Sequence, residues 1–312
     1  MKSILLIIPY FGKWPLWFEP FLISVAANPS IHWLCPTDCP IPPKYPENIH
    51  FLSTTLAQLN IHVNKVVGAK VPLNPRKFCD LKPTYGEIFE KEVKGYDFWG
   101  ICDMDIVWGD IRKFVTPQIL STYDIISSRK ENISGHFTLF RNNSAINQLY
   151  KQLPDYKTLF EVPEFRWTDE VVLSNFLKEN NKGKALGINV YWPSILCNQE
   201  RGHDSHQEYY LDHWIWQNRK MINTKTGEEV MYLHFINWKR TMKYCEVRYW
   251  DSPDQFYISY KGMHYMAHSY LIKIWNSFTN VFDGYYMREF IRIQKKKLRR
   301  IIKKINKKIF KN

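Results

Sequence analysis

Short apolar runs, separated by polar segments and turn residues, recur through the first half of the chain. Residues 4–8 are entirely apolar and stop at a proline, and residues 98–102 follow closely after a glycine, so both runs are typical of strands buried on both faces of a sheet. Similar runs predict strands over 31–35 and 49–53, and a helix is expected over 17–27. Alternating strands and helices indicate βαβ units, and therefore an α/β fold with a mainly parallel sheet.

The later part of the chain continues with shorter elements of both kinds. Thr168 is the expected N-cap of a helix that runs into an apolar stretch, because its hydroxyl can accept a hydrogen bond from the first turn. A glycine within residues 224–227 predicts a hairpin between the runs on either side. The remaining predictions are a helix over 85–93 and strands over 124–127, 134–142 and 256–260.

The candidate chemistry starts at Asp103-Met104-Asp105, directly after the predicted strand 98–102. In an extended chain, residues i and i+2 point to the same side, so both carboxylates can face one ligand. Open α/β sheets bind their ligands at the carboxyl ends of strands, and paired carboxylates suit a hard divalent cation that in turn holds phosphates. The alternative interpretation is a turn with two solvated carboxylates.

Asp103-Met104-Asp105 after an apolar strand resembles the DxD signature of GT-A-type nucleotide-sugar glycosyltransferases. The longer string formed by residues 78–86, 99–105 and 109–110 resembles a bacterial glycosyltransferase family from surface-polysaccharide loci, those for capsule and lipopolysaccharide. The resemblance covers residues 1–240. It implies a GT-A-type, Rossmann-like fold whose mixed, mainly parallel sheet is flanked by helices. It also implies sugar transfer from a nucleotide-sugar donor to a glycan acceptor, which we expect to be lipid-linked.

The resemblance also implies which residues hold a metal ion. The sequence from His234 to Lys239 is similar to a late His-x-x-x-x-Lys element of some retaining GT-A enzymes, in which the histidine completes the metal shell and the lysine binds the diphosphate. Asp103, Asp105 and His234 would then hold Mn²⁺ or Mg²⁺. An imidazole beside two carboxylates suits manganese, which is the softer of these two ions.

Four further residues are expected at the donor. In GT-A enzymes the turn after the first strand approaches the nucleotide, so the resemblance implies that Tyr10 or Phe11 contacts the base; a hydrophobic plug under the turn is the alternative. Asp80 is expected to bind the sugar or ribose, and Lys82 a phosphate, since an ammonium group is a good phosphate partner. An exposed Asp80–Lys82 pair of negligible energy would be the structural alternative.

The remaining candidate residues are expected to contact the acceptor or another part of the substrate. Asp169 and Glu170 stand in the first turn of a predicted helix, where the helix dipole alone favours acids. The resemblance implies a catalytic carboxylate at this place, and a general base must be held close to the attacking hydroxyl. An inverting enzyme would use Asp169 in this way and a retaining enzyme would not, so both chemistries stay open. Gly135, His136 and Asp110 are the expected substrate contacts, with Gly135 allowing close approach to the backbone. For His136 the alternative is a structural histidine held by hydrogen bonds.

The positive charge is concentrated at the end of the chain. The chain carries a net charge of +13, and residues 285–312 hold 12 of the 43 Lys and Arg but one of the 30 Asp and Glu, which gives this tail +11 and leaves the rest nearly neutral. Its apolar residues follow one helical stripe, so the tail predicts an amphipathic helix that binds an anionic membrane surface.

Three parts are therefore expected: a catalytic domain over 1–240, an extension packed on it over 241–284 and the basic tail over 285–312. The first apolar run is too short for a signal peptide, and the six cysteines are scattered, so we expect a cytoplasmic enzyme at the inner face of the membrane. His203 and His206 offer another pair of metal-type ligands. One alternative is a nucleotidyltransferase, which usually has a glycine-rich loop near the first strand. The other is a non-catalytic protein whose tail binds nucleic acid. Because the rest of the chain is nearly neutral, we expect no nucleic-acid partner.

Overall fold

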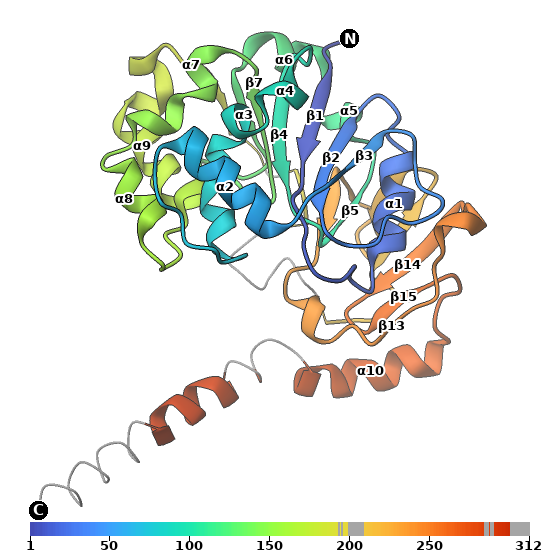
Figure 1. Cartoon of the computed structure of the whole chain (residues 1–312). Helices are drawn as coiled ribbons and strands as arrows, with labels where there is room; N and C mark the ends of the chain where they lie inside the picture. Colours follow the sequence, from blue (N-terminus) through green and yellow to red (C-terminus); the bar gives the residue numbers. More distant parts are fainter. Residues whose placement is uncertain (193, 195, 199–208, 284–286, 288–289, 300–312) are drawn as a thin grey trace, which may run out of the picture.

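The computed structural model describes residues 1–192, 194, 196–198, 209–283, 287 and 290–299. Its first sheet has the strand order β3-β2-β1-β4-β7-β6-β8 (Figure 1). Strands β3, β2, β1 and β4 are parallel, whereas β7 is antiparallel to both of its neighbours. The strands are β1 (Ile4–Ile7), β2 (His32–Thr37), β3 (Ile49–Ser53), β4 (Phe98–Cys102), β6 (Ile125–Ser127), β7 (Phe137–Arg141) and β8 (Val190–Tyr191).

Both faces of this sheet are buried, as the apolar runs predicted. Side chains alternate along β1, so that Leu5 and Ile7 join one apolar core while Ile4 and Leu6 join the other. Helix α2 (Leu56–Val67) covers the first face and α1 (Phe18–Ala26) the second. The predicted fold class, an α/β fold with a mixed, mainly parallel sheet flanked by helices, is confirmed.

The remaining helical segments are short. Residues 85–93 do not form the single helix that was expected, because Phe89 leaves the helical backbone region (φ −110°, ψ 35°) and its ring is buried in the core. The α-helices are α3 (Tyr85–Ile88), α4 (Glu90–Val93), α5 (Ile111–Phe114), α6 (Pro117–Thr122), α7 (Ser144–Asn147), α8 (Tyr156–Glu161), α9 (Leu173–Glu179) and α10 (Tyr270–Asp283). The 3₁₀ helices are η1 (Lys77–Thr84), η2 (Leu149–Gln152), η4 (Asn181–Leu186), η5 (Trp238–Arg240) and η6 (Tyr249–Asp251), and η3 (Thr168–Val172) is a π-helix.

The expected cap at Thr168 is wrong. Trp167 precedes η3 with a left-handed backbone (φ 52°), and no side chain from the same segment caps the helix. The capping acceptor comes instead from η1, because the Asp80 carboxylate accepts hydrogen bonds from the backbone N–H groups of Arg166 and Thr168. A contact between distant segments thus replaces the local cap.

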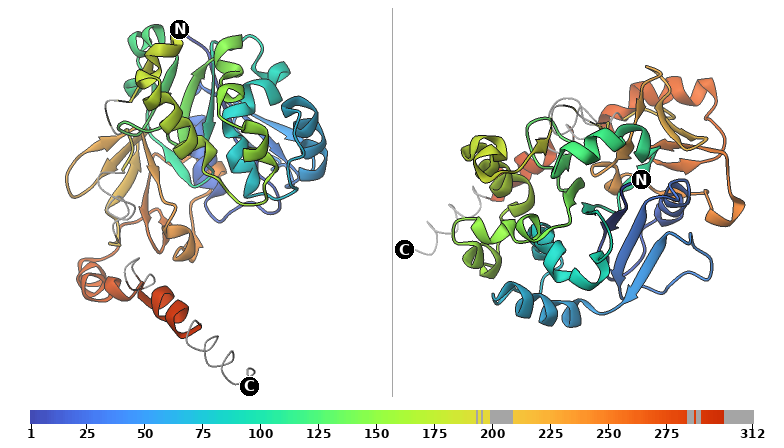
Figure 2. Two further views of the ribbon diagram at one scale, coloured as in Figure 1. Left: turned by 90° about the vertical axis from the view of Figure 1, so that its left-hand side faces the viewer. Right: turned by 90° about the horizontal axis from the view of Figure 1, so that it is seen from above.

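A second sheet follows in the chain and lies beside the first, and α10 lies beyond it (Figure 2). Its order is β11-β10-β9-β14-β15-β13, and β10 and β11 form the predicted hairpin. The predicted boundary at residue 240 falls within this sheet, between β10 and β13; the division into domains stays a prediction. Its strands are β9 (Trp214–Gln217), β10 (Lys220–Asn223), β11 (Glu229–Val230), β13 (Tyr244–Cys245), β14 (Gln255–Ser259) and β15 (Gly262–His264).

A two-stranded pair links the two sheets. Strand β5 (Ile106–Trp108), which follows β4 closely, pairs antiparallel with β12 (Tyr232–His234). This pairing brings a late segment of the chain to the carboxyl end of β4. Among the described residues, no helix combines the length and the apolar character needed to cross a membrane.

Candidate metal and donor site

Asp103, Met104 and Asp105 form a bend between β4 and β5. Two contacts hold the bend in place. The Trp17 indole N–H, just before α1, donates to the Met104 carbonyl at 3.0 Å, and the Phe235 N–H donates to the Asp105 carbonyl at 3.1 Å. The bend is therefore fixed from the beginning and from the late part of the chain.

His234 lies beside the two carboxylates. The register of β5 and β12 sets His234 opposite Ile106, and its Nε2 is 3.4 Å from Asp105 Oδ2. One ligand-type atom each of Asp103, Asp105 and His234 lies within 4.8 Å of the other two. Two carboxylates and an imidazole are a donor set that fits Mn²⁺, and Mg²⁺ with a less typical nitrogen ligand.

Asp105 is buried and has a strongly positive environment. Burial alone would raise its pKa, but Lys239 and His234 outweigh burial and hold the pKa of Asp105 well below its usual range. Lys239 Nζ is 2.9 Å from Asp105 Oδ2, and the Lys239 side chain is 39% exposed. Asp105 is therefore ionised at neutral pH, while Lys239 keeps access to a ligand.

His136 stacks on the ring of His234. Their ring centroids are 4.2 Å apart with planes 24° from parallel. His136 Nδ1 also lies 2.7 Å from the Tyr232 hydroxyl, which is 2.5 Å from Ser128 Oγ. All of these side chains are buried. The contacts fix the ring of His136, and the stacked pair fixes the plane of His234.

Lys82 connects the bend to the acceptor-side residues. Its ammonium group donates to Asp103 Oδ1 at 2.7 Å and to the Gly135 carbonyl at 2.6 Å, and it lies 3.8 Å from Asp169 Oδ2. Burial would lower the pKa of Lys82, but Asp103 and Asp169 raise it well above its ordinary value. Lys82 is buried and charged, so the alternative of an exposed Asp80–Lys82 pair is wrong.

Asp169 is buried at the start of η3. Burial raises the pKa of Asp169 to about 7, with Lys82 opposing and Glu170 adding to the shift. A Cβ atom on Gly135 would lie 2.5 Å from Asp169 Oδ2. The glycine therefore permits the close approach of Asp169, while the expected approach of a substrate to Gly135 stays a prediction. Glu170 Oε1 accepts from the Gly135 N–H at 3.1 Å and from Arg129 at 3.3 Å, which binds η3 to the segment before β7.

Asp80 is occupied within the protein. Besides capping η3, it forms an ion pair of 2.9 Å with Lys77, and both side chains are fully buried. Asp80 therefore holds η3, and with it Asp169, instead of facing a ligand.

Tyr10 follows β1 and forms a β-bridge with Thr37. Burial raises the pKa of the Tyr10 hydroxyl; among the smaller effects, Lys239 lowers this pKa and Asp105 raises it. Phe11 packs against the core.

Asp110 lies at the edge of the sheet formed by the amino ends of the parallel strands, opposite to the site around Asp103. It accepts a hydrogen bond from the Arg112 N–H as the N-cap of α5, and Arg112 in turn binds the carbonyls of Lys2 and Ser30 near the start of β1. This placement separates Asp110 from the residues gathered around Asp103, and its substrate contact stays a prediction that the site at the carboxyl ends does not support. The reason is that β5 runs back along the molecule before Asp110 is reached.

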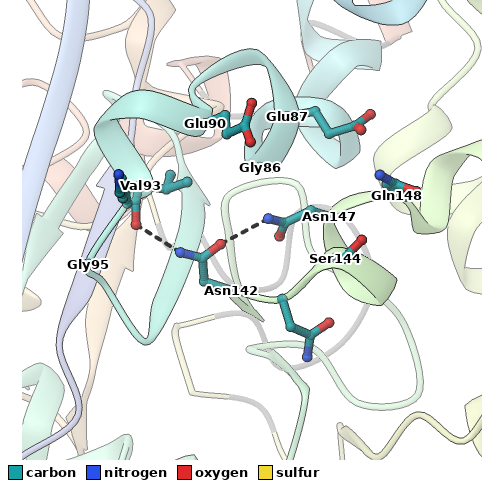
Figure 3. Close-up of a pocket in the computed structure, with 11 residues that line it drawn as sticks. Gly86, Glu87, Glu90, Val93, Gly95, Asn142, Ser144, Asn147 and Gln148 are labelled. Carbon is teal, nitrogen blue, oxygen red and sulfur yellow. Dashed lines mark hydrogen bonds between the residues drawn. The ribbon is translucent and has the colours of Figure 1, made fainter.

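A cavity of about 460 Å³ also lies at that opposite edge (Figure 3). Its lining comes from α3, from α4 and the two residues after it, and from residues 142–148, which include α7. Asn142 is held there by hydrogen bonds to Val93 and Asn147. The lining contains none of the residues gathered around Asp103. The cavity and the candidate chemistry are therefore separate.

A second cluster of metal-type ligands was missed by the sequence analysis. It consists of Asp212, His264 and His268 in the second sheet and the segments next to it. The spacing His-x-x-x-His was the available signal. His203 and His206, the pair that was singled out instead, lie outside the described residues.

Comparisons with known proteins place the chain in a family. No curated protein matches the sequence. The structure is similar to that of the galactosyltransferase LgtC in complex with donor and acceptor sugar analogues, at 12% identity over 55% of this chain and 70% of that chain, with a TM-score of 0.34. A structure of an active-site variant of LgtC matches at 12% identity over 74% of this chain and 86% of that one, with a TM-score of 0.39. Mouse xyloside xylosyltransferase 1 matches at 10% identity over 62% and 78%, with a TM-score of 0.31. The model of a family of unknown function, DUF6625, matches residues 6–267, and the chain belongs to this family.

Proposed function

We propose that this protein is a metal-dependent glycosyltransferase that moves a sugar from a nucleotide-sugar donor to a glycan acceptor. The observation that carries the proposal is the convergence of Asp103, Asp105 and His234 from two distant segments, with their ligand-type atoms within 4.8 Å of one another. Two lysines flank the three residues. Carboxylates, an imidazole and nearby ammonium groups together suit a divalent cation and a diphosphate.

Asp103, Asp105 and His234 would hold the Mn²⁺ or Mg²⁺ ion. When bound, this ion acts as a Lewis acid that stabilises the negative charge of the leaving diphosphate. Lys239 is the protein's own contribution to the same task, since its side chain is partly exposed and its charge is held by Asp105. Lys82 holds Asp103 in place. Tyr10, which follows β1 at this edge, is the proposed contact of the nucleotide base.

Asp169 belongs to the acceptor side of the proposal. A pKa of about 7 suits a general base at neutral pH, because both protonation states are then accessible. Asp80, Glu170 and Gly135 position Asp169 through the contacts described above. In an inverting reaction Asp169 accepts the proton of the attacking hydroxyl; in a retaining reaction it orients the acceptor.

The proposed acceptor is lipid-linked, as in the synthesis of cell-surface polysaccharide. The basic tail 285–312 supports this proposal, because Lys and Arg near an anionic leaflet contribute about 1 kcal/mol each to membrane binding. The protein would then work at the inner face of the cell membrane. Of this tail, residues 285–286, 288–289 and 300–312 lie outside the described residues.

The test is hydrolysis of a panel of nucleotide-sugars by the full chain with Mn²⁺, with Mg²⁺ and with excess EDTA. Glycosyl transfer to water releases a nucleoside diphosphate and free sugar, whereas a nucleotidyltransferase would cleave the diphosphate linkage itself and release a nucleotide and a sugar phosphate. The anomeric configuration of the first product, followed by NMR, separates inversion from retention. Turnover that EDTA leaves unchanged would refute the metal-dependent proposal.

A further inference from the structure

Helix α10 exposes its apolar residues and buries a polar one. Between residues 270 and 282, the buried side chain is Asn276, which is 2% exposed. A helix on a protein surface normally has the reverse pattern. The large apolar side chains that are between 38% and 77% exposed are Tyr270, Leu271, Ile272, Ile274, Trp275, Phe278, Val281 and Phe282.

Polar contacts fix this orientation of the helix. Asn276 accepts a hydrogen bond from the Leu211 N–H at 3.2 Å and donates to the Tyr260 hydroxyl at 2.6 Å. Lys273, three residues earlier and so on the same side of the helix, lies 3.1 Å from Asp212 Oδ2. Because the polar side is bound to the second sheet, the apolar side faces away from the protein.

Exposed apolar surface of this extent marks an interaction site. The described segment that follows α10 indicates what kind of surface it meets. Residues 290–299 are helical and carry five basic residues and no acid (Arg292, Lys295, Lys296, Lys297 and Arg299), while Phe290, Ile291, Ile293 and Leu298 are exposed. A second copy of the chain would bring two such basic segments together, and their charges would repel. An anionic lipid surface is complementary to both the charge and the apolar side chains.

We infer that α10 inserts its apolar side into an anionic membrane surface and is the element that penetrates the lipid. Its 14 residues span about 21 Å at 1.5 Å per residue, less than the ~30 Å hydrocarbon core, so the helix lies in the plane of the interface. Trp275 and Tyr270 are the side chains that prefer this depth. The sequence predicts that residues 241–284 pack on the catalytic domain, and it assigns them no role in membrane binding.

The orientation of the fold relates this surface to the proposed site. Strands β1 and β4 run toward the side of the molecule on which α10 lies (Figure 1). Asp103 and Asp105 follow the end of β4, so the site lies toward the same side of the molecule as α10. The consequence for a lipid-linked acceptor rests on the proposed function, whereas membrane insertion itself does not.

Flotation of the full chain with vesicles tests the inference. The vesicles contain phosphatidylglycerol and phosphatidylcholine, or phosphatidylcholine alone. The variant Trp275→Glu/Phe278→Glu changes two side chains that are 70% and 71% exposed, and Ile61→Glu on α2 is a control matched at 71%. We expect the double variant to bind anionic vesicles at least about tenfold more weakly, because each large apolar side chain contributes more than that when fully buried. The control should bind like the wild type.

Flotation at high salt separates apolar insertion of α10 from electrostatic attraction of the basic tail to the vesicles. At about 1 M salt the Debye length falls to ~3 Å, so the binding that remains is due to apolar insertion. Wild type should retain part of its binding there and the double variant should retain none. Equal flotation of both proteins would overturn the inference. So would a wild-type dimer in lipid-free solution that the double variant loses, since a second copy would then cover the helix.

Nucleotide-sugar hydrolysis, measured without lipid, shows whether a failure concerns membrane insertion or the proposed function. The double variant should hydrolyse the donor like the wild type, whereas Asp105→Ala should lose hydrolysis and still float. Failed flotation with metal-dependent hydrolysis would overturn the role of α10 alone. Flotation without hydrolysis would overturn the proposed glycosyl transfer alone.

Discussion

Asp105 after β4 and Asp212 before β9 are both buried carboxylates with imidazole and ammonium neighbours, yet their surroundings differ. Asp212 Oδ1 accepts from His264 Nε2 and His268 Nδ1, both at 2.8 Å, and Oδ2 accepts from the His268 N–H at 2.6 Å and pairs with Lys273. Burial would raise the pKa of Asp212, but these hydrogen bonds outweigh it and hold the pKa well below its usual range. Both oxygens are therefore fully engaged by the protein.

The cluster around Asp105 is more open. The side chain of Asp103 is 31% exposed and that of Lys239 is 39% exposed, so a ligand can reach both. In the Asp212 cluster the other nitrogens of His264 and His268 already face the Tyr244 hydroxyl, at 3.4 and 3.3 Å. The same residue types thus serve two purposes. The open cluster is therefore the one that suits the proposed metal, and we interpret the closed one as the anchor of the segment leading into α10.

The largest expected effect separates the two clusters by activity. Asp103→Ala and Asp105→Ala should each lower kcat for donor hydrolysis by about 10³-fold, since each removes a proposed metal ligand and the charge stabilisation that depends on it. Asp212→Asn is the matched control and should keep kcat within about twofold, because Asp212 contacts none of the site residues. Comparable losses from Asp105→Ala and Asp212→Asn would contradict the assignment.

Asp169→Asn is expected to lower kcat by about 10²-fold if Asp169 is the base. In the wild type, kcat should rise with pH through about 7, as Asp169 loses its proton. The variant should lose this rise and should keep its affinity for Mn²⁺. An unchanged pH profile in the variant would remove Asp169 from proton transfer.

Asp169 also predicts how stability depends on pH: as the pH rises, kcat should increase while the free energy of unfolding should decrease. The folded-state pKa of Asp169 is raised, so its protonated form favours folding, and this contribution is present below the unfolded pKa and is lost as the pH rises to about 7. The free energy of unfolding of the wild type, relative to Asp169→Asn, should therefore fall between about pH 4 and pH 7. Urea unfolding of both proteins across this range measures the difference, and parallel curves would count against the raised pKa.

Asp212→Asn should reduce the free energy of unfolding by about 2–3 kcal/mol, since hydrogen bonds to a charged group are weakened. It should leave the affinity for Mn²⁺ unchanged, which isothermal titration of the full chain can measure. A loss of Mn²⁺ binding in this variant, with retention in Asp105→Ala, would reverse the roles of the two clusters.

The smallest effect concerns the second layer of the open cluster. His136→Phe keeps a ring against His234 but loses the hydrogen bond to Tyr232, and we expect Mn²⁺ affinity to fall about tenfold. Tyr232→Phe is the companion variant, because it removes the same hydrogen bond from the other side. Unchanged affinity in both variants would show that His234 needs no support from His136.

Sequence patterns were sufficient where an element is determined by its own residues. The apolar runs at β1 and β4 gave the correct strands because a strand buried on both faces must be apolar along its whole length. Asp103 and Asp105 were found for the same local reason, since they stand directly after such a strand. The hairpin between β10 and β11 followed from its glycine, which has a positive φ of 73°.

Only the tertiary structure decided which distant residues meet. The resemblance implied that His234 joins Asp105, but the contact itself depends on the pairing of β12 with β5. Asp80 caps a helix that starts 88 residues later, and Asp110 is carried away to the opposite edge. The exposed apolar side of α10 is likewise decided by Lys273 and Asn276, which bind the second sheet. The physical reason is that propensity and periodicity act over a few neighbouring residues, whereas these contacts arise from strand pairing and from buried polar groups that must find partners across the fold.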